Sequence, residues 1–503
     1  MSSVQVRVLA LFSIGYFVSY VFRGVNLGFA PFVTHELGLS AADLGLLTSL
    51  YFLGFAGAQI PAGVMLDHFG ARRVTAGMLL FAAAGAAVFG AAHGIGTMMV
   101  GRLLIGVGVS VCLGAAFKAL AQHFPVGRLP LVNGLVMAVG GLGGVVVGSP
   151  LTWLLGWTNW RAICFGLAVL TVVVAASIGF GAPEAKQVRH QGGLVSQFKG
   201  TWHILSSRAF WKISSFSVVT QGVFYAMQSL WVGPYLRDVA GFDAPHAARL
   251  VSVLGFAMMA GCVGFGAAAR VLERRGVSVY AFCGVGMALF VATQVAIVAR
   301  MPLPPAVLWA AYGMFGGVGI LTYAVMAGHF PAHLIGRANT TLTLVIFLLI
   351  FAFQIGVGAV LSRWPAVDGR YPAAAHLTAW GVLLALQLAS AIWYVWPVRG
   401  AGQAHRSGGT LVDGAAAETG PQHVERAPYR AAGGGARMIG QPYRLKIGPF
   451  SGYNLKVCAD QPRTLAPTSF IPFIRRTPPA GRCREASCAT RRVRVSTTQA
   501  ASS

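Results

Sequence analysis

Apolar residues recur along the chain, as far as about residue 397, in runs of roughly 20 that short polar segments separate. A helix of about 20 apolar residues spans the roughly 30 Å hydrocarbon core of a bilayer. The pattern predicts an all-α membrane protein with twelve spans, over residues 6–30, 44–66, 74–93, 97–121, 131–155, 160–181, 211–236, 247–271, 277–299, 303–328, 339–361 and 374–397.

Composition agrees with this pattern, because 56% of the residues are hydrophobic and only 10% are charged. Soluble domains carry about 25% charged residues, so a water-soluble fold is excluded. The first run contains Tyr16, Tyr20 and Arg23 and lacks a small-residue cleavage site followed by a soluble domain. We therefore interpret it as a retained spanning helix rather than as a signal peptide.

The net charge of +25 is divided between the helical body and the segment that follows it. Residues 399–503 hold 16 of the 38 basic and 5 of the 13 acidic residues. In the body, basic residues gather in alternate loops, at Arg72, Arg73, Arg128, Lys186, Arg189, Lys199, Arg208, Lys212, Arg270, Arg274, Arg275 and Arg337. By the positive-inside rule these loops face the cytoplasm, and with an even number of helices both termini do as well. We expect the chain to lie in an inner (plasma) membrane. The basic excess is thus topological, and no nucleic-acid partner is expected.

Residues 399–503 are rich in Gly, Ala, Pro, Ser and Arg and hold no run long enough to span a membrane. We expect a disordered, basic cytoplasmic tail with no role in transport. The seven cysteines show no metal-ligand spacing, and the chain has no nucleotide-binding loop and no constellation of catalytic residues. Neither an enzyme nor a cofactor nor a metal site is predicted.

Three segments repeat at one offset of 206 residues, which indicates two homologous halves. His123-Phe124-Pro125 and then Asn133 correspond to His329-Phe330-Pro331 and Asn339. Asp67-His68-Phe69-Gly70 corresponds to Glu273-Arg274-Arg275-Gly276. The predicted division is an N-terminal six-helix bundle (1–181), a cytoplasmic central loop (182–210), a C-terminal six-helix bundle (211–398) and the tail (399–503).

Residues 63–73, Gly-Val-Met-Leu-Asp-His-Phe-Gly-Ala-Arg-Arg, lie between the second and third predicted helices. They resemble the loop motif of the major facilitator superfamily (MFS), and Arg102 to Gly108 resembles its arginine-plus-glycine motif in helix four. The resemblance covers residues 1–398 and implies two six-helix bundles around a central cavity that opens alternately to each side. It also implies that a conformational loop, formed by Gly63, Asp67, Gly70, Arg72 and Arg73, helps to hold the outward-open state. His68 stands where the family has a basic residue, and a simple tight turn is the alternative interpretation.

The fifth predicted helix is rich in glycine, with Gly140, Gly144 and Gly148 on one face. Small residues at this spacing let helices approach closely, whether for packing or for gating. The helix matches the antiporter motif of drug exporters only in part, because the glycine pair after Pro150 is absent. Drug export is therefore disfavoured.

In the resembled family the first, fourth, seventh and tenth helices line the cavity, so their polar residues are the candidates for solute binding. Tyr16, Tyr20 and Arg23 share a face of the first helix, and Gln221, Tyr225 and Gln228 share a face of the seventh. An arginine at membrane depth is costly and by default marks function. The predicted substrate-binding residues are Tyr16, Tyr20, Arg23, Arg102, Gln221, Tyr225, Gln228 and Tyr323. The aromatic and amide residues have a second interpretation, as hydrogen-bonded contacts between helices.

All eight carboxylates of the body lie in loops or at helix ends. A central cavity with arginines and no acid favours an anion, which the planar fork of arginine binds with two hydrogen bonds. We therefore predict a monomeric secondary transporter for a small organic acid or oxyanion, by proton symport or by anion exchange. The alternatives are a multidrug efflux antiporter and a transporter-like sensor that binds the anion without carrying it.

Overall fold

The computed structural model describes residues 2–125, 128–183, 194–330, 332–367 and 369–396, all of which belong to one compact unit. The predicted tail and parts of the central loop, with Lys186 and Arg189, lie outside these residues. Within them the structure is helical, and the one β-bridge joins Val367 to Arg370. An all-α fold is therefore confirmed.

The first half of the described chain contains seven helices: α1 (Ser3–Leu37), α2 (Ala41–Gly90), α3 (Ile95–Val109), α4 (Cys112–His123), α5 (Leu129–Val146), α6 (Ser149–Leu155) and α7 (Trp160–Gly181). The second half contains α8 (Leu194–Leu205), α9 (Arg208–Ala226), the π-helix η2 (Met227–Trp231), α10 (Val232–Asp238), α11 (Ala244–Arg274), α12 (Val279–Val298), α13 (Pro305–Gly316), the 3-10 helix η3 (Gly317–Ile320), α14 (Leu321–His329), α15 (Ala332–Leu361) and α16 (Ala373–Val395). Helix α8 lies where the sequence predicted a loop.

By length and composition, nine helices among the described residues can cross a membrane, or ten if the bent pair α5–α6 is one span. Helix α2 holds two spans, because 50 residues of helix would measure about 75 Å. They meet at Gly70, whose φ of 82° and ψ of 163° suit only glycine. The continuous segment α9–η2–α10 supplies the remaining span. Its polar residues, among them Ser217 and Gln221, keep it out of a count based on apolarity alone. With the second span of α2 and this segment added to the ten, the described residues form twelve spans.

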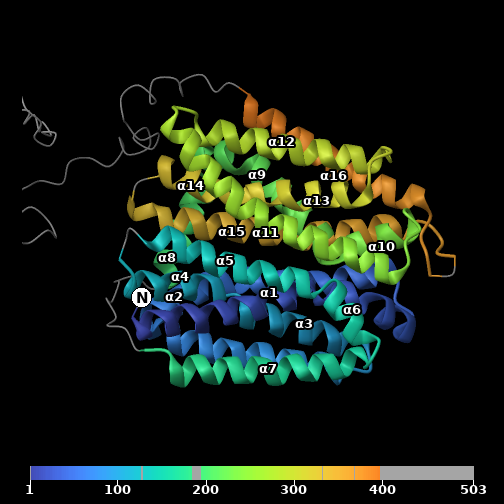
Figure 1. The fold of residues 1–503 in the computed structure, drawn as a ribbon, viewed down its shortest axis with the longest axis horizontal. Helices are drawn as coiled ribbons and strands as arrows, with labels where there is room; N and C mark the ends of the chain where they lie inside the picture. Colours follow the sequence, from blue (N-terminus) through green and yellow to red (C-terminus); the bar gives the residue numbers. More distant parts are fainter. Residues whose placement is uncertain (1, 126–127, 184–193, 331, 368, 397–503) are drawn as a thin grey trace, which may run out of the picture. The chain divides into compact units, whose positions relative to one another are not determined.

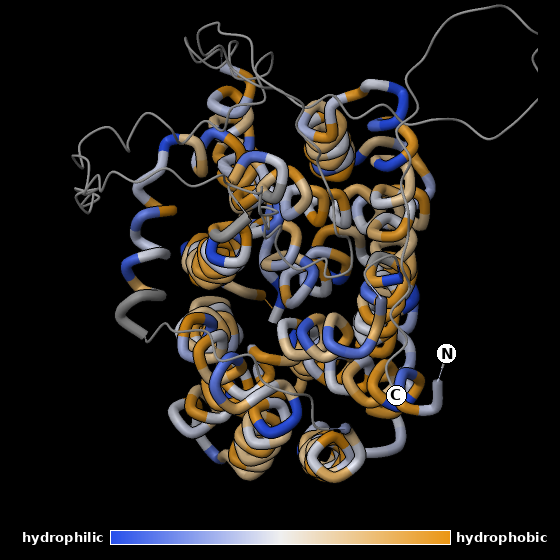
Figure 2. Tube along the Cα trace, turned by 90° about the vertical axis from the view of Figure 1, so that its left-hand side faces the viewer, coloured by the Kyte–Doolittle hydropathy of each residue, from blue (hydrophilic) through white to orange (hydrophobic). Residues whose placement is uncertain are grey.

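The helices run side by side, and Figure 1 shows the N-terminal half (blue to green) next to the C-terminal half (yellow-green to orange), with α5 and α11 along the boundary. Helix α8 and the chain's beginning lie at one end of the helices, and α6 and α10 lie at the other. Viewed along the helices, apolar colour predominates (Figure 2). We refer below to the α8 end and the α10 end.

The predicted repeat has the same local geometry in both halves. His123 and His329 each place Nδ1 2.8 Å from the carbonyl oxygen four residues earlier, at Ala119 and Val325. The next residues, Phe124 and Phe330, are extended in both cases and donate their N–H to a carbonyl in the preceding turn. Gly70 and Gly276, also 206 residues apart, share a φ of 82°. The repeated sequences therefore end and break their helices in the same way.

The two halves pack most closely toward the α10 end. A Cβ on Gly148, which precedes α6, would lie 2.8 Å from the carbonyl oxygen of Ala248 in α11, and Ser149 N–H donates to Ser252 Oγ over 2.9 Å. Nearer the α8 end, a Cβ on Gly134 of α5 or on Gly266 of α11 would meet no atom within 4 Å. Along α5, α6 and α11, the closest contacts between the halves thus lie at the α10 end.

Candidate functional site

Arg23 of α1 lies at the boundary between the halves, with only 7% of its surface exposed. Its guanidinium carbon lies 4.5 Å from the ring centre of Tyr20, 5.2 Å from that of Tyr225 in α9 and 5.3 Å from that of Phe347 in α15. Phe55 of α2 adds a fourth ring at 6.0 Å. No ion pair of the described residues includes Arg23, and its Nε has no hydrogen-bond partner there. The charge is therefore held by aromatic faces rather than by a carboxylate.

Two predicted tyrosines adjoin Arg23 on α1. Tyr16 and Tyr20 pack edge to face, with ring centres 5.5 Å apart, and both are buried. The ring of Tyr16 lies directly over Gly140 of α5, where even a Cβ would overlap it. The absence of a side chain at Gly140 thus leaves room for this ring.

Residues of the C-terminal half face this cluster around Arg23. The side chains of Tyr20 and Gln228 both reach the sulfur of Met258 in α11, over 3.8 and 3.5 Å. Gln228 belongs to the π-helix η2, an irregularity often found at functional sites. Tyr323 bonds Thr343 of α15 through its hydroxyl over 3.0 Å.

Two other predicted binding residues point elsewhere. Gln221 is buried inside the C-terminal half, where its Nε2 donates to Ser217 Oγ and to the carbonyl of Gly319. Arg102 is 1% exposed inside the N-terminal half, where it donates to the carbonyl of Phe22 over 3.2 Å. Their place is thus within a bundle wall, and direct solute contact by either stays a prediction.

Residues that the sequence analysis did not select complete the surroundings. Phe55 and Phe347 stack with ring centres 3.9 Å apart across the two halves. Tyr51 of α2 donates its hydroxyl to the carbonyl of Ser19, and its ring centre lies 5.4 Å from the guanidinium of Arg102. These three residues belong to the second and eleventh predicted spans, whereas the predicted binding residues come from the first, fourth, seventh and tenth.

Gly140→Ala is expected to displace the Tyr16 ring and lower anion affinity by about tenfold, a cost typical of a small overpacking. The matched control is Gly134→Ala on the same helix, where the added methyl group meets no atom within 4 Å. Ligand-dependent thermal stabilisation measures the change in affinity. Equal affinities of the two variants would show that the position of Tyr16 is unimportant for binding.

The predicted conformational loop lies at the α8 end. Lys118 of α4 donates to Asp67 Oδ1 over 2.8 Å and to the carbonyl of Leu66, so this lysine is a partner of the motif that the sequence analysis did not identify. Arg72 Nε donates to the carbonyl of Gly179 in α7 over 2.7 Å. Gly63 lies one turn before Asp67 and meets no close neighbour. The motif therefore ties α2 to α4 and α7 within the N-terminal half.

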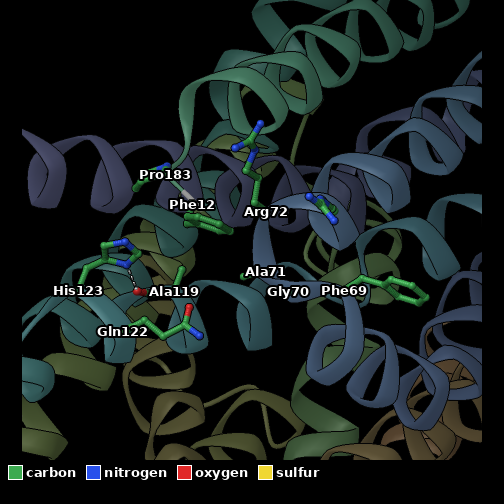
Figure 3. Close-up of a pocket in the computed structure, with 10 residues that line it drawn as sticks. Phe12, Phe69, Gly70, Ala71, Arg72, Ala119, Gln122, His123 and Pro183 are labelled. Carbon is green, nitrogen blue, oxygen red and sulfur yellow. Dashed lines mark hydrogen bonds between the residues drawn. The ribbon is translucent and has the colours of Figure 1, made fainter. Parts of the chain in front are cut away.

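A cavity of about 20 Å³ adjoins this motif, lined by Phe12, Phe69, Gly70, Ala71, Arg72, Arg73, Ala119, Gln122, His123 and Pro183. Figure 3 shows His123 beside Ala119, with Phe69 directed away from them. The volume suits one water molecule and no organic solute. This cavity is therefore not the solute site.

The described residues include no group of three or more His, Cys, Asp or Glu placed to hold a metal ion. The cluster around Arg23 instead consists of a buried cation surrounded by aromatic rings and hydroxyl groups. Such a site can bind an anion reversibly by charge and hydrogen bonds.

Comparison with known proteins identifies a family. The family model of the Major Facilitator Superfamily matches residues 12–354. The probable sulfoacetate transporter SauU of Cupriavidus necator is 24% identical over 273 residues, 51% of this chain and 62% of that protein. The probable nitrate/nitrite antiporter NarK1 of Thermus thermophilus is 28% identical over 244 residues, 44% of this chain and 52% of that protein. The chain thus matches between half and two-thirds of the length of these relatives.

Among solved structures, the D-xylose-proton symporter superimposes with a TM-score of 0.61 at 13% sequence identity. The match covers 81% of this chain and 100% of that chain. This similarity shows the shared fold, and a fold alone does not identify a solute.

Proposed function

Because this chain belongs to the major facilitator superfamily and is a multi-pass membrane protein, we propose that it carries a small anionic solute. Arg23 is the anion-binding group. The single observation that supports this most is the enclosure of Arg23 by rings from both halves, with no carboxylate partner among the described residues. A buried guanidinium repels a cation and leaves its charge unbalanced beside a neutral solute, whereas an oxyanion neutralises it. The relatives named for sulfoacetate and for nitrate and nitrite support the same class of solute.

The arrangement of the halves supports an alternating-access mechanism. Arg23 and Tyr20 come from one half and Tyr225 and Met258 from the other, so movement of the halves changes the distances between these two pairs. The hydrogen bonds that join the halves at the α10 end close it, and on this ground we assign the structure to an inward-facing state. The solute then leaves or enters from the α8 side, past Tyr16 and Tyr323.

We propose that the chain lies in the inner membrane and that its α8 end faces the cytoplasm. Described basic residues near that end include Arg72, Arg73, Arg128, Lys199 and Arg337. The positive-inside rule and the even number of spans then put both termini in the cytoplasm. The conformational loop around Asp67 lies on this side, where it holds the N-terminal half rigid while the halves move.

Proteoliposomes that contain the full chain provide the test. Uptake of sulfoacetate, nitrate, xylose and tetraphenylphosphonium is compared, first with an inward proton gradient and then with internal anion. Uptake of either anion that depends on the proton gradient supports symport, and uptake that depends on internal anion supports exchange. Uptake of the cation alone would indicate drug antiport, and binding of an anion without uptake would indicate a sensor. Either result would refute the proposal.

A further inference from the structure

Asp238, the last residue of α10, is buried to an extent unlike the other described carboxylates in ion pairs. Its side chain is 0% exposed, whereas those of Asp67, Glu36 and Asp243 are 36%, 41% and 61% exposed. A buried carboxylate is tolerated only where hydrogen bonds and opposite charge replace water.

Three nitrogen atoms surround this carboxylate. Oδ1 accepts a bond of 2.6 Å from Arg237 Nε, and Oδ2 accepts one of 3.2 Å from the backbone N–H of Tyr371. Nε2 of His376, at the start of α16, lies 3.1 Å from Oδ2 and donates to it. Three segments, α10, the α15–α16 connection and α16, thus converge on one side chain.

Titratable and charged groups near Asp238 lie on α10 and α16 and after α12. They are Arg237 beside it, His376 on α16, and Tyr235, whose ring packs on His376 and is influenced by the charge of Arg300. Burial by itself raises the pKa of Asp238, but the hydrogen bonds from His376 and Arg237 outweigh it and lower the pKa below its ordinary value of 3.8. The carboxylate is therefore ionised at neutral pH.

Asp238 and Arg237 together hold the turn that carries Tyr371. The backbones of Val367 and Arg370 bond each other in both directions, and Gly369 between them has a φ of 69°. Arg237 Nη2 donates to the carbonyl of Gly369 over 3.1 Å. The turn that carries Tyr371 is thus bonded to α10 through both Asp238 and Arg237.

From this position Tyr371 reaches the other half of the molecule. Its hydroxyl accepts the N–H of Ala41 over 2.9 Å, and Ser362 Oγ accepts the N–H of Ala42 over 2.9 Å. These are the first N–H groups of α2, which have no partner within their own helix. Backbone also meets backbone here, since a Cβ on Gly358 would lie 2.5 Å from the carbonyl oxygen of Ala41. Opening this end must break both hydrogen bonds.

Building on the proposed transport function, we propose that Asp238 is a positioning residue of the outer gate, which holds Tyr371 where its hydroxyl caps α2 of the opposite half. Asp238, His376 and Tyr371 then form a latch, defined by these three residues, that closes the α10 end in the inward-facing state. The ring of His376 is held by Tyr235, so the latch is fixed to the body of the C-terminal half. Neither Asp238 nor His376 touches the solute.

The effect of pH follows from the direction of the shift. A carboxylate whose pKa is lower in the closed gate than in the water-filled open gate stabilises closure while it is ionised. This stabilisation is complete above the ordinary value of 3.8 and is lost as the pH falls through the lowered value. Between about pH 5 and 8 the contribution of Asp238 is therefore constant, and its effect is tested by substitution.

Amide hydrogen exchange of the full chain in nanodiscs, with no solute present, tests the latch. Asp238→Asn keeps the shape of the side chain and removes its charge, and the matched control Asp243→Asn breaks an exposed ion pair at the same end. The latch predicts that exchange at Ala41 and Ala42, in the opposite half, accelerates about tenfold in Asp238→Asn, the effect of losing one charged hydrogen bond. The control should exchange like the parent.

Tyr371→Phe is the second variant, because it removes the acceptor for Ala41 and leaves the surroundings of Asp238 in place. Faster exchange at Ala41 and Ala42 with unchanged protection near His376 is expected. If Asp238→Asn accelerates exchange only in residues 369–376, Asp238 is merely structural and the proposal fails. Since no solute is used, the hydrogen-exchange result does not depend on the outcome of the anion uptake assay.

Discussion

Arg23→Gln is expected to abolish anion-dependent thermal stabilisation while changing the stability of the ligand-free protein by no more than about 1–2 kcal/mol. Loss of a buried charge partner typically costs binding about 2–5 kcal/mol, which lowers affinity by a factor of about 30 or more. In the free protein, by contrast, the terms oppose one another. Contacts with four rings stabilise the guanidinium by up to about 2 kcal/mol for the nearest. Burial and the unpaired Nε cost a similar amount.

The measurement is a thermal unfolding series of the full chain against sulfoacetate and nitrate. Arg23→Lys keeps the charge but loses the planar fork, so an intermediate affinity is expected. Arg161→Gln, which breaks the ion pair with Glu36 near the α10 end, is the matched control and should bind like the parent. Anion binding that survives in Arg23→Gln would refute the proposed role of Arg23.

Gly106→Ala is expected to be the most destabilising small substitution in the N-terminal half, by about 1–3 kcal/mol or more. A Cβ there would overlap the carbonyl oxygen of Tyr51 and lie 3.1 Å from the N atom of Phe55. Both are backbone atoms of α2, which cannot rotate away as a side chain can. The close packing of α3 on α2 also holds Tyr51 beside Arg102, so the site loosens with it.

Gly166→Ala in α7 is the control for this substitution, since a Cβ at Gly166 meets no atom within 4 Å. Alanine in an exposed helix position is favoured over glycine, so this variant should be equally or slightly more stable. The free energy of unfolding in detergent, from a denaturant series, compares the two variants. Similar stabilities would mean that α3 shifts away from α2 at little cost.

Much of the fold could be predicted from apolar runs, because each span must be long enough for the membrane and must satisfy its own backbone. The predicted boundary between spans two and three, 66 to 74, encloses the break at Gly70 that the structure shows. Interruptions inside spans were not predicted. The breaks after Val146 and Val109 and the π-helix at Met227–Trp231 depend on packing between helices rather than on local polarity.

The candidate site was predictable in part. A shared helix face placed Tyr16, Tyr20 and Arg23 together, since helical spacing alone decides which residues of one helix are neighbours. The same reasoning could not separate Tyr225, which faces Arg23, from Gln221, which bonds Gly319 within its own half. That difference depends on the rotation of α9 against its neighbours.

By itself, the sequence determined the number of spans, the repeat of 206 residues and the paired glycine breaks, because these depend on local hydrophobicity and backbone freedom. The pairing of Lys118 with Asp67, the hydrogen bond from Arg102 to Phe22 and the one from the Tyr371 N–H to Asp238 could be found only in the tertiary structure. Each of these contacts joins helices that are distant in the chain. Their relative rotation and depth come from the packing of whole surfaces, which no single segment encodes.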